Sequence, residues 1–298
     1  MKFTKMQGCG NDYVYVDGGS EKISQEKKSE LAKRVSDRHF GIGSDGLIFI
    51  NPVEDDDIDF EMEMYNADGS RSEMCGNGIR CVAKYVYDKG LTDKKKLTIV
   101  SAGKKKYIDL TVGANNKVES VKVDMGAPIL DAETVPVSVP EDKLTSSDKF
   151  AELNGKYGHL AVDVPITVDG KQWHMTCVSM GNPHCVVFVE DAEGFPIYEY
   201  GPLFESHEKF PRKTNTEFVE VKDKSHLRMR VWERGAAVTL ACGTGSCATL
   251  TAAVLNGLAD RKAEIQLDGG RLQVEWADNN HLYMTGPAEE VFTGVADI

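Results

Sequence analysis

The sequence predicts an α+β protein built from two duplicated halves. Strand-like patterns outnumber helical ones along the 298 residues, which is typical of this fold class. Two Cys-Gly-x-Gly turns, at 75–78 and 242–245, each open an apolar helical repeat. The triplets Gly10-Asn11-Asp12 and Gly181-Asn182-Pro183 also match, at nearly the same offset along the chain as the two turns. Two matches in the same order, at nearly one offset, indicate an internal duplication.

Strand patterns occur in twelve segments of the chain. Apolar residues alternate with Glu over 60–64 and with Arg over 227–231, and this period of two is that of a half-buried strand. The other candidates are 13–17, 47–50, 97–101, 107–112, 118–124, 172–179, 185–190, 216–221, 271–276 and 281–285.

Helical periodicity occurs in three segments. Leu31 and Val35 share one face of a helix predicted over 24–37, for which the first residue is a serine suited to an N-cap. The other two helices, over 76–88 and 243–256, follow the Cys-Gly turns, and a glycine ends each of them. Few helices among many strands again favour the α+β class.

The most polar part of the chain is 131–160, which predicts a linker or a surface insertion. We place a domain boundary near Gly126-Ala127-Pro128 and therefore expect one half over 1–128 and the other over 129–285. A chain of this length can bury most of its apolar surface without disulfides.

Composition and charge exclude several classes of protein. The formal net charge of −12 argues against nucleic-acid binding, because phosphate backbones attract basic surfaces. No apolar run is long enough to span a membrane, and the N-terminus has no secretory apolar region, so we expect a cytoplasmic protein without membrane partners. The seven cysteines should then be thiols, and the absence of a paired C-x-x-C argues against a metal site.

The Cys-Gly turns suggest acid–base chemistry at sulfur. Backbone N–H groups at a helix start favour an anion, which could be a thiolate or a substrate carboxylate. If the two halves face each other, one cysteine would flank each side of an amino-acid α-carbon. A thiolate could then remove the α-proton from one face while a thiol supplies a proton to the other. We therefore predict a cofactor-independent amino-acid racemase or epimerase with Cys75 and Cys242 as the catalytic pair.

The simplest alternative is that these cysteines are small core residues, as most buried cysteines are. Cys81, Cys177 and Cys247 lie within apolar periodicity, and we interpret all three as core residues. Cys9 and Cys185 fit either interpretation.

Motifs along nearly the whole chain resemble the diaminopimelate epimerase family. They are GCGNDYVYVD (8–17), RHFGIGSDG (38–46), YNADGSRSEMCGNGIRC (65–81), SMGNPHCVVFV (179–189), NTEFVEV (215–221), ERGA (233–236) and LACGTGSCA (240–248). The resemblance implies two pseudo-symmetric halves, each an antiparallel sheet or near-barrel around a central helix. It also implies that the chain end, 286–298, returns to the first half.

The resemblance further implies an isomerase that converts LL-2,6-diaminopimelate to the meso form in the synthesis of lysine and peptidoglycan precursors, without cofactor, as a homodimer. Cys75 would act on the LL substrate and Cys242 on the meso one, with His184 and Glu233 as their proton partners. Substrate contacts are implied for Asn11, Asn66, Gly76, Asn77, Asn182, Asn215, Glu233, Arg234, Gly243 and Thr244.

Two departures from the family pattern keep alternatives open. Ala237-Val238-Thr239 follows ERGA where the family usually has Gly-Glu-Thr, and Gly46 stands where some members carry Gln. These positions are compatible with a same-fold racemase of histidine or proline type. A thiol-redox binding protein is an alternative of another class. A pyridoxal phosphate enzyme is disfavoured, because no motif marks a Schiff-base lysine.

Overall fold

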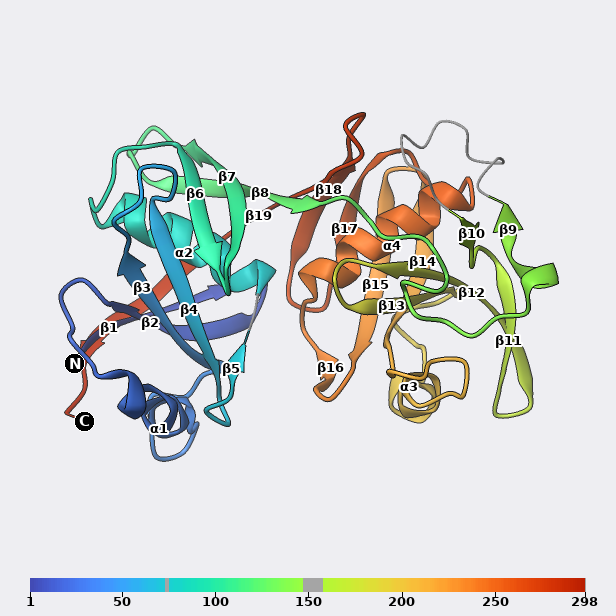
Figure 1. Cartoon of the computed structure of the whole chain (residues 1–298), viewed down its shortest axis with the longest axis horizontal. Helices are drawn as coiled ribbons and strands as arrows, with labels where there is room; N and C mark the ends of the chain where they lie inside the picture. The colour runs from blue at the N-terminus through green and yellow to red at the C-terminus, as the bar shows by residue number, and fades with distance from the viewer. Residues whose placement is uncertain (73–74, 147–157, 298) are drawn as a thin grey trace. The chain divides into compact units, whose positions relative to one another are not determined.

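The computed structural model describes residues 1–72, 75–146 and 158–297 (Figure 1). Contacts divide the chain into two compact units. The first comprises 1–124 with 285–298, and the second comprises 125–284. Strands β8 and β19 carry the chain from one unit to the other. The α+β class and the two-part organisation predicted from the sequence are thus confirmed.

The described part of the first unit contains two helices. Helix α1 follows β2, and helix α2 follows the short strand β5. Its elements are β1 (Lys2–Gly8), β2 (Asn11–Asp17), α1 (Gln25–Ser36), β3 (Gly46–Pro52), β4 (Phe60–Asn66), β5 (Arg71–Ser72), α2 (Gly76–Asp88), β6 (Lys96–Ser101), β7 (Lys104–Val112), β8 (Val118–Gly126) and β20 (Glu289–Val295).

The second unit repeats this order after a short lead-in segment. Its elements are the 3-10 turn η1 (Glu141–Lys143), β9 (Thr145–Ser146), β10 (His159–Leu160), β11 (Val164–Val168), β12 (Lys171–Ser179), β13 (Pro183–Phe188), α3 (Ile197–Glu205), β14 (Asn215–Asp223), β15 (His226–Glu233), β16 (Ala237–Thr239), α4 (Gly243–Leu255), β17 (Lys262–Gln266), β18 (Arg271–Trp276) and β19 (Leu282–Gly286).

Strand pairing follows the same sequence in both units, which establishes the duplication. In the first, β1–β2 is antiparallel, β2–β3 parallel, β3–β4 antiparallel, β4–β6 parallel and β6–β7 antiparallel. In the second, β12–β13, β13–β14, β14–β15, β15–β17 and β17–β18 alternate in the same way. The sheets are therefore mixed, with two parallel pairs in the described residues of each unit, where the resemblance implied an antiparallel sheet or near-barrel.

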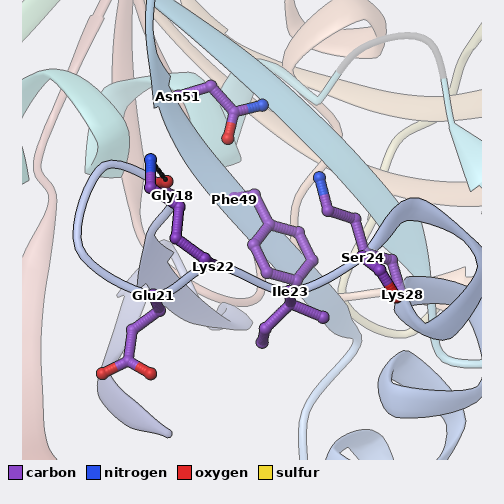
Figure 2. A pocket seen from close by; sticks show the side chains of 8 residues that line it. All are labelled: Gly18, Glu21, Lys22, Ile23, Ser24, Lys28, Phe49 and Asn51. Atoms are coloured by element: carbon purple, nitrogen blue, oxygen red, sulfur yellow. Dashed lines mark hydrogen bonds between the residues drawn. The ribbon is translucent and has the colours of Figure 1, made fainter.

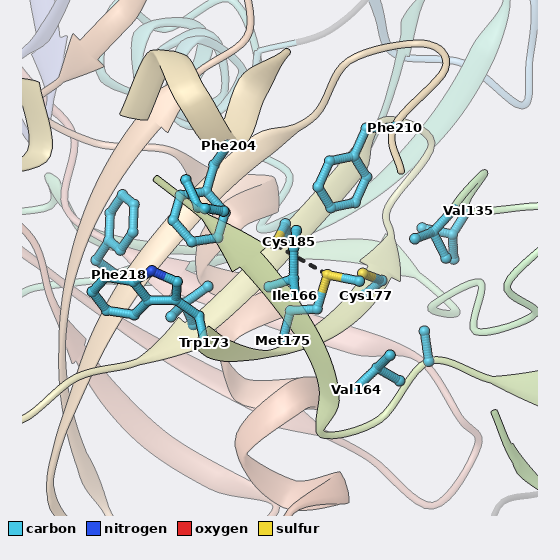
Figure 3. Close-up of a cluster of buried hydrophobic side chains, with 14 of the residues drawn as sticks. Val135, Val164, Ile166, Trp173, Met175, Cys177, Cys185, Phe204, Phe210 and Phe218 are labelled. Carbon is cyan, nitrogen blue, oxygen red and sulfur yellow. Dashed lines mark hydrogen bonds between the residues drawn. The ribbon is translucent and has the colours of Figure 1, made fainter. Parts of the chain in front are cut away.

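In the described residues of each unit, one helix packs on one face of the strands and a second helix packs on the other face. Helix α2 packs against β1, β2, β6 and β7, and α4 packs against β12–β15, β17 and β18. Helix α1 covers the other face of β2, β3 and β4, and α3 packs against β11, β14, β15 and β16. The α3 side carries a buried cluster in which Trp173, Phe204 and Phe218 pack edge to face (Figure 3).

Side-chain alternation along the strands decides which residues reach the central helices. Val14 belongs to the α1-side cluster, whereas Tyr15 points the other way and its hydroxyl donates to the Gly78 carbonyl in α2 at 3.3 Å. On β14, Phe218 belongs to the α3-side cluster, so Glu217 is directed to the α4 side.

The chain ends meet in the first unit (Figure 1). Strand β20 pairs antiparallel with β1, and the Met1 amino group donates to the Ala296 carbonyl at 2.8 Å. Neither strand was predicted. Most β20 side chains are exposed, so burial imposes no alternation on its sequence.

The three predicted helices are confirmed, while α3 was missed. Gly201 and Pro202 interrupt its sequence, and both disfavour a helix interior. Gly201 is needed because a Cβ there would lie 2.5 Å from the Trp232 ring. Ser24 is the N-cap of α1, as predicted, but its side chain makes no cap hydrogen bond.

The interpretation of 131–160 as a linker or surface insertion is wrong for part of that segment. Ala132, Val135 and Val137 are buried in the α3-side cluster, and Val135 is drawn in Figure 3. Residues 147–157 lie outside the described part of the chain. Among the described residues, no helix is long and apolar enough to cross a membrane.

Candidate active site

Each predicted catalytic cysteine is the N-cap of a central helix. Cys75 precedes α2 with φ −133° and ψ 114°, and Cys242 precedes α4 with φ −124° and ψ 110°. Each Sγ accepts a hydrogen bond from the backbone N–H three residues on, Gly78 or Gly245, at 3.3 Å. Both thiols thus occupy the anion-favouring end of a helix, as the turn sequences predicted.

The last glycine of each turn lies close to the thiol and to one strand side chain. A Cβ on Gly78 would lie 3.0 Å from the Ile48 side chain and 3.6 Å from the Cys75 sulfur. A Cβ on Gly245 would lie 2.7 Å from Glu217 Oε1 and 3.2 Å from the Cys242 sulfur. The last glycine of each Cys-Gly-x-Gly turn therefore leaves room for the thiol and one strand side chain.

Cys75 makes its side-chain hydrogen bonds with uncharged polar groups of its own unit. The Cys75 thiol donates to Asn11 Oδ1 at 3.1 Å, and Asn77 Nδ2 donates to the same oxygen at 3.4 Å. Burial, together with the neighbouring Cys75, raises the pKa of Tyr13, so this phenol stays protonated. Asn11 is fixed from behind, because its Nδ2 donates to Asp45 Oδ2 at 2.6 Å.

Burial raises the pKa of the Cys75 thiol. The hydrogen bonds from the Gly78 N–H, Tyr13 and the Asn77 N–H, and the charge of Arg80, lower it but do not outweigh the burial. The helix N-terminus therefore moderates a rise in thiol pKa rather than producing the net decrease that such a site can give.

Two more predicted site residues lie in this unit. Asn66 ends β4 opposite Gly46, and its Nδ2 donates to Ser70 Oγ at 3.0 Å. Gly76 is the first residue of α2, directly after Cys75. Hydrogen bonds thus bring Asn11 and Asn77 together with Cys75, Gly76 follows it in the chain, and Asn66 lies at the end of β4.

Ionisable groups surround Cys242 in the second unit. His184 Nδ1 lies 2.6 Å from Glu217 Oε1, and His184 Nε2 lies 3.2 Å from Asn182 Oδ1. Asn182 Nδ2 donates to Thr244 Oγ1 at 3.3 Å, and that oxygen lies 3.5 Å from the Cys242 sulfur. Gly243, between Cys242 and Thr244, is the first residue of α4.

Glu233 ends β15 on the same side of the unit. Burial raises the pKa of its carboxyl group, while hydrogen bonds from Thr239 and Cys242 and the charge of His184 lower it without cancelling the effect. Thr239 Oγ1 donates to Glu233 Oε1. A carboxyl group with a raised pKa near a thiol is suited to proton exchange.

Burial also raises the pKa of Cys242, well above the usual thiol range. The negative charges of Glu233 and Glu217 raise it further, and the Thr244 and Gly245 hydrogen bonds lower it only in part. Cys242 is 5% exposed, whereas Cys75 is half-buried. The two thiols therefore share backbone geometry but differ in charge surroundings.

Asn215 and Arg234 are linked by the backbone. The Arg234 N–H donates to Asn215 Oδ1 at 2.9 Å, and Asn215 Nδ2 donates to the Pro183 carbonyl at 3.0 Å. Asn215 is 4% exposed, so its amide holds the segments that carry His184 and Arg234. The Arg234 side chain is exposed, and one guanidinium nitrogen donates to the Arg212 carbonyl at 2.9 Å.

Sequence reasoning missed Tyr13 and Glu217 as site residues. Glu217 lies in the quoted segment NTEFVEV, where it is a carboxylate inside a run of buried strand residues. A charged residue at such a position signals a buried partner, and His184 is that partner. Tyr13 is in the quoted segment GCGNDYVYVD, but aromatic residues on strands usually serve packing.

The remaining cysteines are buried thiols, as predicted for Cys81, Cys177 and Cys247. Cys9 and Cys185 are buried as well.

A surface pocket of about 270 Å³ lies beside the α1 start in the first unit (Figure 2). The Lys28 ammonium near it pairs with Glu63 at 2.5 Å and lies 4.6 Å from the centre of the Phe49 ring. None of the predicted site residues lines this pocket. The residues that line it are Gly18, Glu21, Lys22, Ile23, Ser24, Lys28, Phe49 and Asn51.

The sequence pattern of the family described as diaminopimelate epimerase matches residues 3–130 and 176–291. These ranges contain both thiol-capped helices and their surroundings. The chain belongs to the diaminopimelate epimerase family. Proteins named diaminopimelate epimerase from Agathobacter rectalis and from Methanococcus maripaludis are 54% and 55% identical to it, each over 100% of both chains.

Solved structures of proteins with much lower sequence identity share the fold. A phenazine biosynthesis protein of the PhzF family from Bacillus anthracis superposes with a TM-score of 0.67 at 16% identity, covering 99% of each chain. A probable proline racemase from Agrobacterium radiobacter superposes with a TM-score of 0.65 at 12% identity, covering 100% of this chain and 93% of the other.

The structure gives a packing reason for two of the three residues that depart from the diaminopimelate epimerase pattern. A Cβ on Gly46 would lie 2.1 Å from the Tyr65 carbonyl oxygen and 2.9 Å from the Tyr13 ring. Val238 packs against the α3-side cluster. Ala237 has φ +59°, the left-handed conformation that suits the glycine usual in the family, so the alanine at this position has no packing explanation.

Proposed function

We propose that the chain is a cofactor-independent epimerase that interconverts LL- and meso-2,6-diaminopimelate. Family membership and full-length relatives named diaminopimelate epimerase support this reaction over others. The observation that carries the two-thiol mechanism is the matched pair of N-caps, Cys75 and Cys242, each with an N–H···Sγ hydrogen bond at 3.3 Å.

In the proposed reaction, the two sulfurs lie on opposite sides of one α-carbon. The thiolate of one cysteine takes the α-proton, and the electron pair of the broken C–H bond moves toward the substrate carboxylate. The other cysteine's thiol then protonates the opposite face, and the pair returns to carbon. The first sulfur ends as a thiol and the second as a thiolate, so the reverse reaction uses the same groups in exchanged roles.

The helix starts supply the groups that stabilise the charge of this intermediate. We propose that Gly76, Asn77, Gly243 and Thr244 bind the α-carboxylate, because donors at helix N-termini stabilise developing negative charge. His184 and Glu233 exchange protons with the thiols. The raised pKa of Glu233 and its hydrogen bond with Cys242 support that assignment for Glu233.

The far end of the substrate carries a second ammonium and carboxylate. We propose that Arg234 pairs with that carboxylate, since its guanidinium is exposed and offers further donors. Asn11, Asn66, Asn182 and Asn215 complete the contacts or hold them in place. A site with this many polar groups would reject substrates that lack the distal group.

Two alternatives are less favoured. A histidine or proline racemase drew support only from Gly46 and Ala237-Val238, and packing accounts for Gly46 and Val238, while family membership favours diaminopimelate. A thiol-redox binding protein would need no paired proton donors beside its cysteines, whereas Glu233 lies beside Cys242.

Deuterium uptake tests the proposed function. LL-diaminopimelate is incubated with the protein in heavy water containing a metal chelator and no added pyridoxal phosphate, and deuterium at the α-carbon is followed by mass spectrometry. We expect uptake together with formation of the meso isomer. Uptake with histidine or proline but not with diaminopimelate would reject the substrate assignment.

Serine variants test the two thiols. In Cys75→Ser and Cys242→Ser the hydroxyl can still cap the helix, so the fold is retained, but a serine is a far weaker acid at neutral pH. We expect turnover to fall at least about a thousandfold in each. Cys247→Ser, on the same helix α4, is the matched control and should remain active. Full turnover in either N-cap variant would favour the redox alternative.

We further propose that the two compact units act as separate domains, with limits close to residues 128 and 285. We also propose a cytoplasmic homodimer. The thiol state of all seven cysteines supports a reducing compartment, and size-exclusion chromatography with light scattering would test the dimer.

A further inference from the structure

A fully buried pair of ionisable residues lies behind the Cys242 site. His184, on β13, and Glu217, on β14, are both 0% exposed, and Nδ1 lies 2.6 Å from Oε1. Taking such groups from water has a large desolvation cost, which their mutual attraction offsets only when geometry is favourable. The pair therefore needs an explanation beyond stability.

The first unit shows that the fold itself does not require this pair. Tyr13 and His184 each directly follow one of the two matching triplets, and so they hold corresponding positions of β2 and β13. Ile48 and Glu217 are likewise the third residues of β3 and β14. Ile48 contacts the glycine of the Cys75 turn as Glu217 contacts that of the Cys242 turn. A hydrophobic side chain thus fills in one unit the place of a carboxylate in the other.

Glu217 also carries a buried atom that is incompletely satisfied. Its second oxygen, Oε2, has no hydrogen-bond partner among the residues that the structure describes. Buried polar atoms are normally paired, and an exception calls for an explanation such as a catalytic role, strain or a bound water or ion. The carboxylate is therefore retained despite a free-energy cost.

The hydrogen bonds of His184 lead toward Cys242. Both ring nitrogens face acceptors, the Glu217 carboxylate and Asn182 Oδ1, so this network assigns a proton to each nitrogen. Asn182 in turn donates to Thr244 Oγ1, whose hydroxyl can donate to the Cys242 sulfur. This order of donors runs from His184 to the thiol.

We propose that Glu217 is a positioning residue, which holds His184 in one orientation as a doubly protonated ring and thereby orders the Asn182–Thr244 hydrogen bonds at Cys242. This role rests on the proposed epimerase function. It gives the Cys242 half of the site a charged hydrogen-bond network, while the Cys75 half uses the neutral Tyr13. The duplicated units are thereby specialised.

Other ionisable groups face the pair. They are Glu233 from β15, Cys242 at the start of α4, and Cys185 from β13, which lies close enough to Glu217 for its charge to act on the thiol. Any pH response of the site includes these groups, so the test compares variants that differ at Glu217 alone.

Glu217→Gln removes the carboxylate charge while keeping an oxygen of similar placement. Nitrogen-15 NMR of histidine-labelled protein reports the protonation of the His184 ring without any substrate. We expect two N–H protons on the ring at pH 7 in the parent protein and one in Glu217→Gln. A singly protonated ring in the parent, or no change in the variant, would overturn the proposal.

Kinetics test the consequence for the reaction. We expect Glu217→Gln to lower kcat about 10- to 100-fold, as for other groups that orient a reacting residue, with KM nearly unchanged. A merely structural role would lower the stability of the protein and leave kcat of the folded enzyme unchanged.

Glu63→Gln is the matched control, because Glu63 is another buried carboxylate with a cationic partner and lies in the Lys28 pair of the first unit. It should keep kcat and its pH profile. Unchanged kcat in Glu217→Gln, with an active parent, would reject the positioning role while leaving the proposed function intact. A parent protein without epimerase activity would reject the proposed function. The NMR comparison would then be the only test of whether Glu217 keeps the His184 ring doubly protonated.

Discussion

Ile48 and Glu217 occupy equivalent positions in the two units, each against the glycine three residues after a thiol N-cap. One position is apolar and the other carries a buried carboxylate, although backbone and strand order correspond. The fold is therefore compatible with an apolar residue at this position, and the carboxylate needs a chemical explanation. Substitutions that exchange the two side chains can measure its effect on stability and on activity separately.

The first prediction concerns the His184–Glu217 pair. His184→Tyr alone should lower the free energy of unfolding by about 3–5 kcal/mol, because Glu217 is left as an unpaired buried charge. The double variant with Glu217→Ile recreates the Tyr13 and Ile48 pair of the first unit, and its stability should return to that of the parent or exceed it. Urea denaturation measures both. A double variant less stable than the single one would contradict the equivalence.

The second prediction concerns alkylation of the two thiols without substrate. Raised pKa values mean that each thiolate forms only above the usual thiol range, so iodoacetamide should react slowly at pH 7 and faster as the pH rises past about 8.5. Cys75 should react before Cys242, which is more buried and lies beside two carboxylates. Peptide mass spectrometry gives the order, and buried Cys247 should react only on unfolding. Earlier labelling of Cys242 would show that its carboxylates are neutralised.

The third prediction concerns the left-handed residue Ala237. The Cβ of a residue in this conformation costs about 1–2 kcal/mol, and glycine removes that cost. Glycine also raises the conformational entropy of the unfolded chain, which lowers stability and offsets part of the gain. Ala237→Gly should therefore raise the free energy of unfolding by about 0.5–1 kcal/mol. Ala236→Gly is the control, since Ala236 has no positive φ, and it should be neutral or destabilising. Equal effects in both variants would remove the conformational explanation.

The fourth prediction concerns acid unfolding and Glu63. Burial raises the pKa of this carboxyl group, but hydrogen bonds from Lys28, Gln25, Tyr65 and Asn51 outweigh it and lower the pKa to about 2. In the unfolded chain a glutamate titrates near about pH 4.3. The folded state therefore gains stability from ionised Glu63 above that pH and loses the gain as the pH falls toward 2.

Glu63→Gln should be less stable at pH 6, and its stability should fall less steeply between pH 5 and 2. Urea denaturation across this range measures the difference. Parallel curves for variant and parent would show that the Lys28 pair does not stabilise the fold.

The parts of the fold that sequence predicted are those governed by local rules. The helices after Cys75 and Cys242 begin and end within a residue of their predicted limits, because a capping turn, apolar periodicity and a terminal glycine coincide. Strands β4 and β15 were predicted from alternation that burial on one face imposes. Local signals at α3 pointed away from a helix, and packing against Trp232 overrode them.

The site was predictable to the extent that its residues lie in turns with a distinctive pattern. Pairing between Glu217 and His184 was not, because the two residues are 33 positions apart and meet only through the parallel pairing of β13 and β14. The direction of the thiol pKa shifts could not be predicted from the sequence either, because it depends on how deeply the tertiary structure buries each helix start.

The pairing of β1 with β20 has a consequence for biosynthesis. Residues 125–286 contain every strand of the later repeat, so that repeat can fold while the chain is still being translated. The earlier repeat keeps an open sheet edge until 289–295 emerge from the ribosome. Chaperones that shield nascent strands would therefore be needed most by residues 1–124.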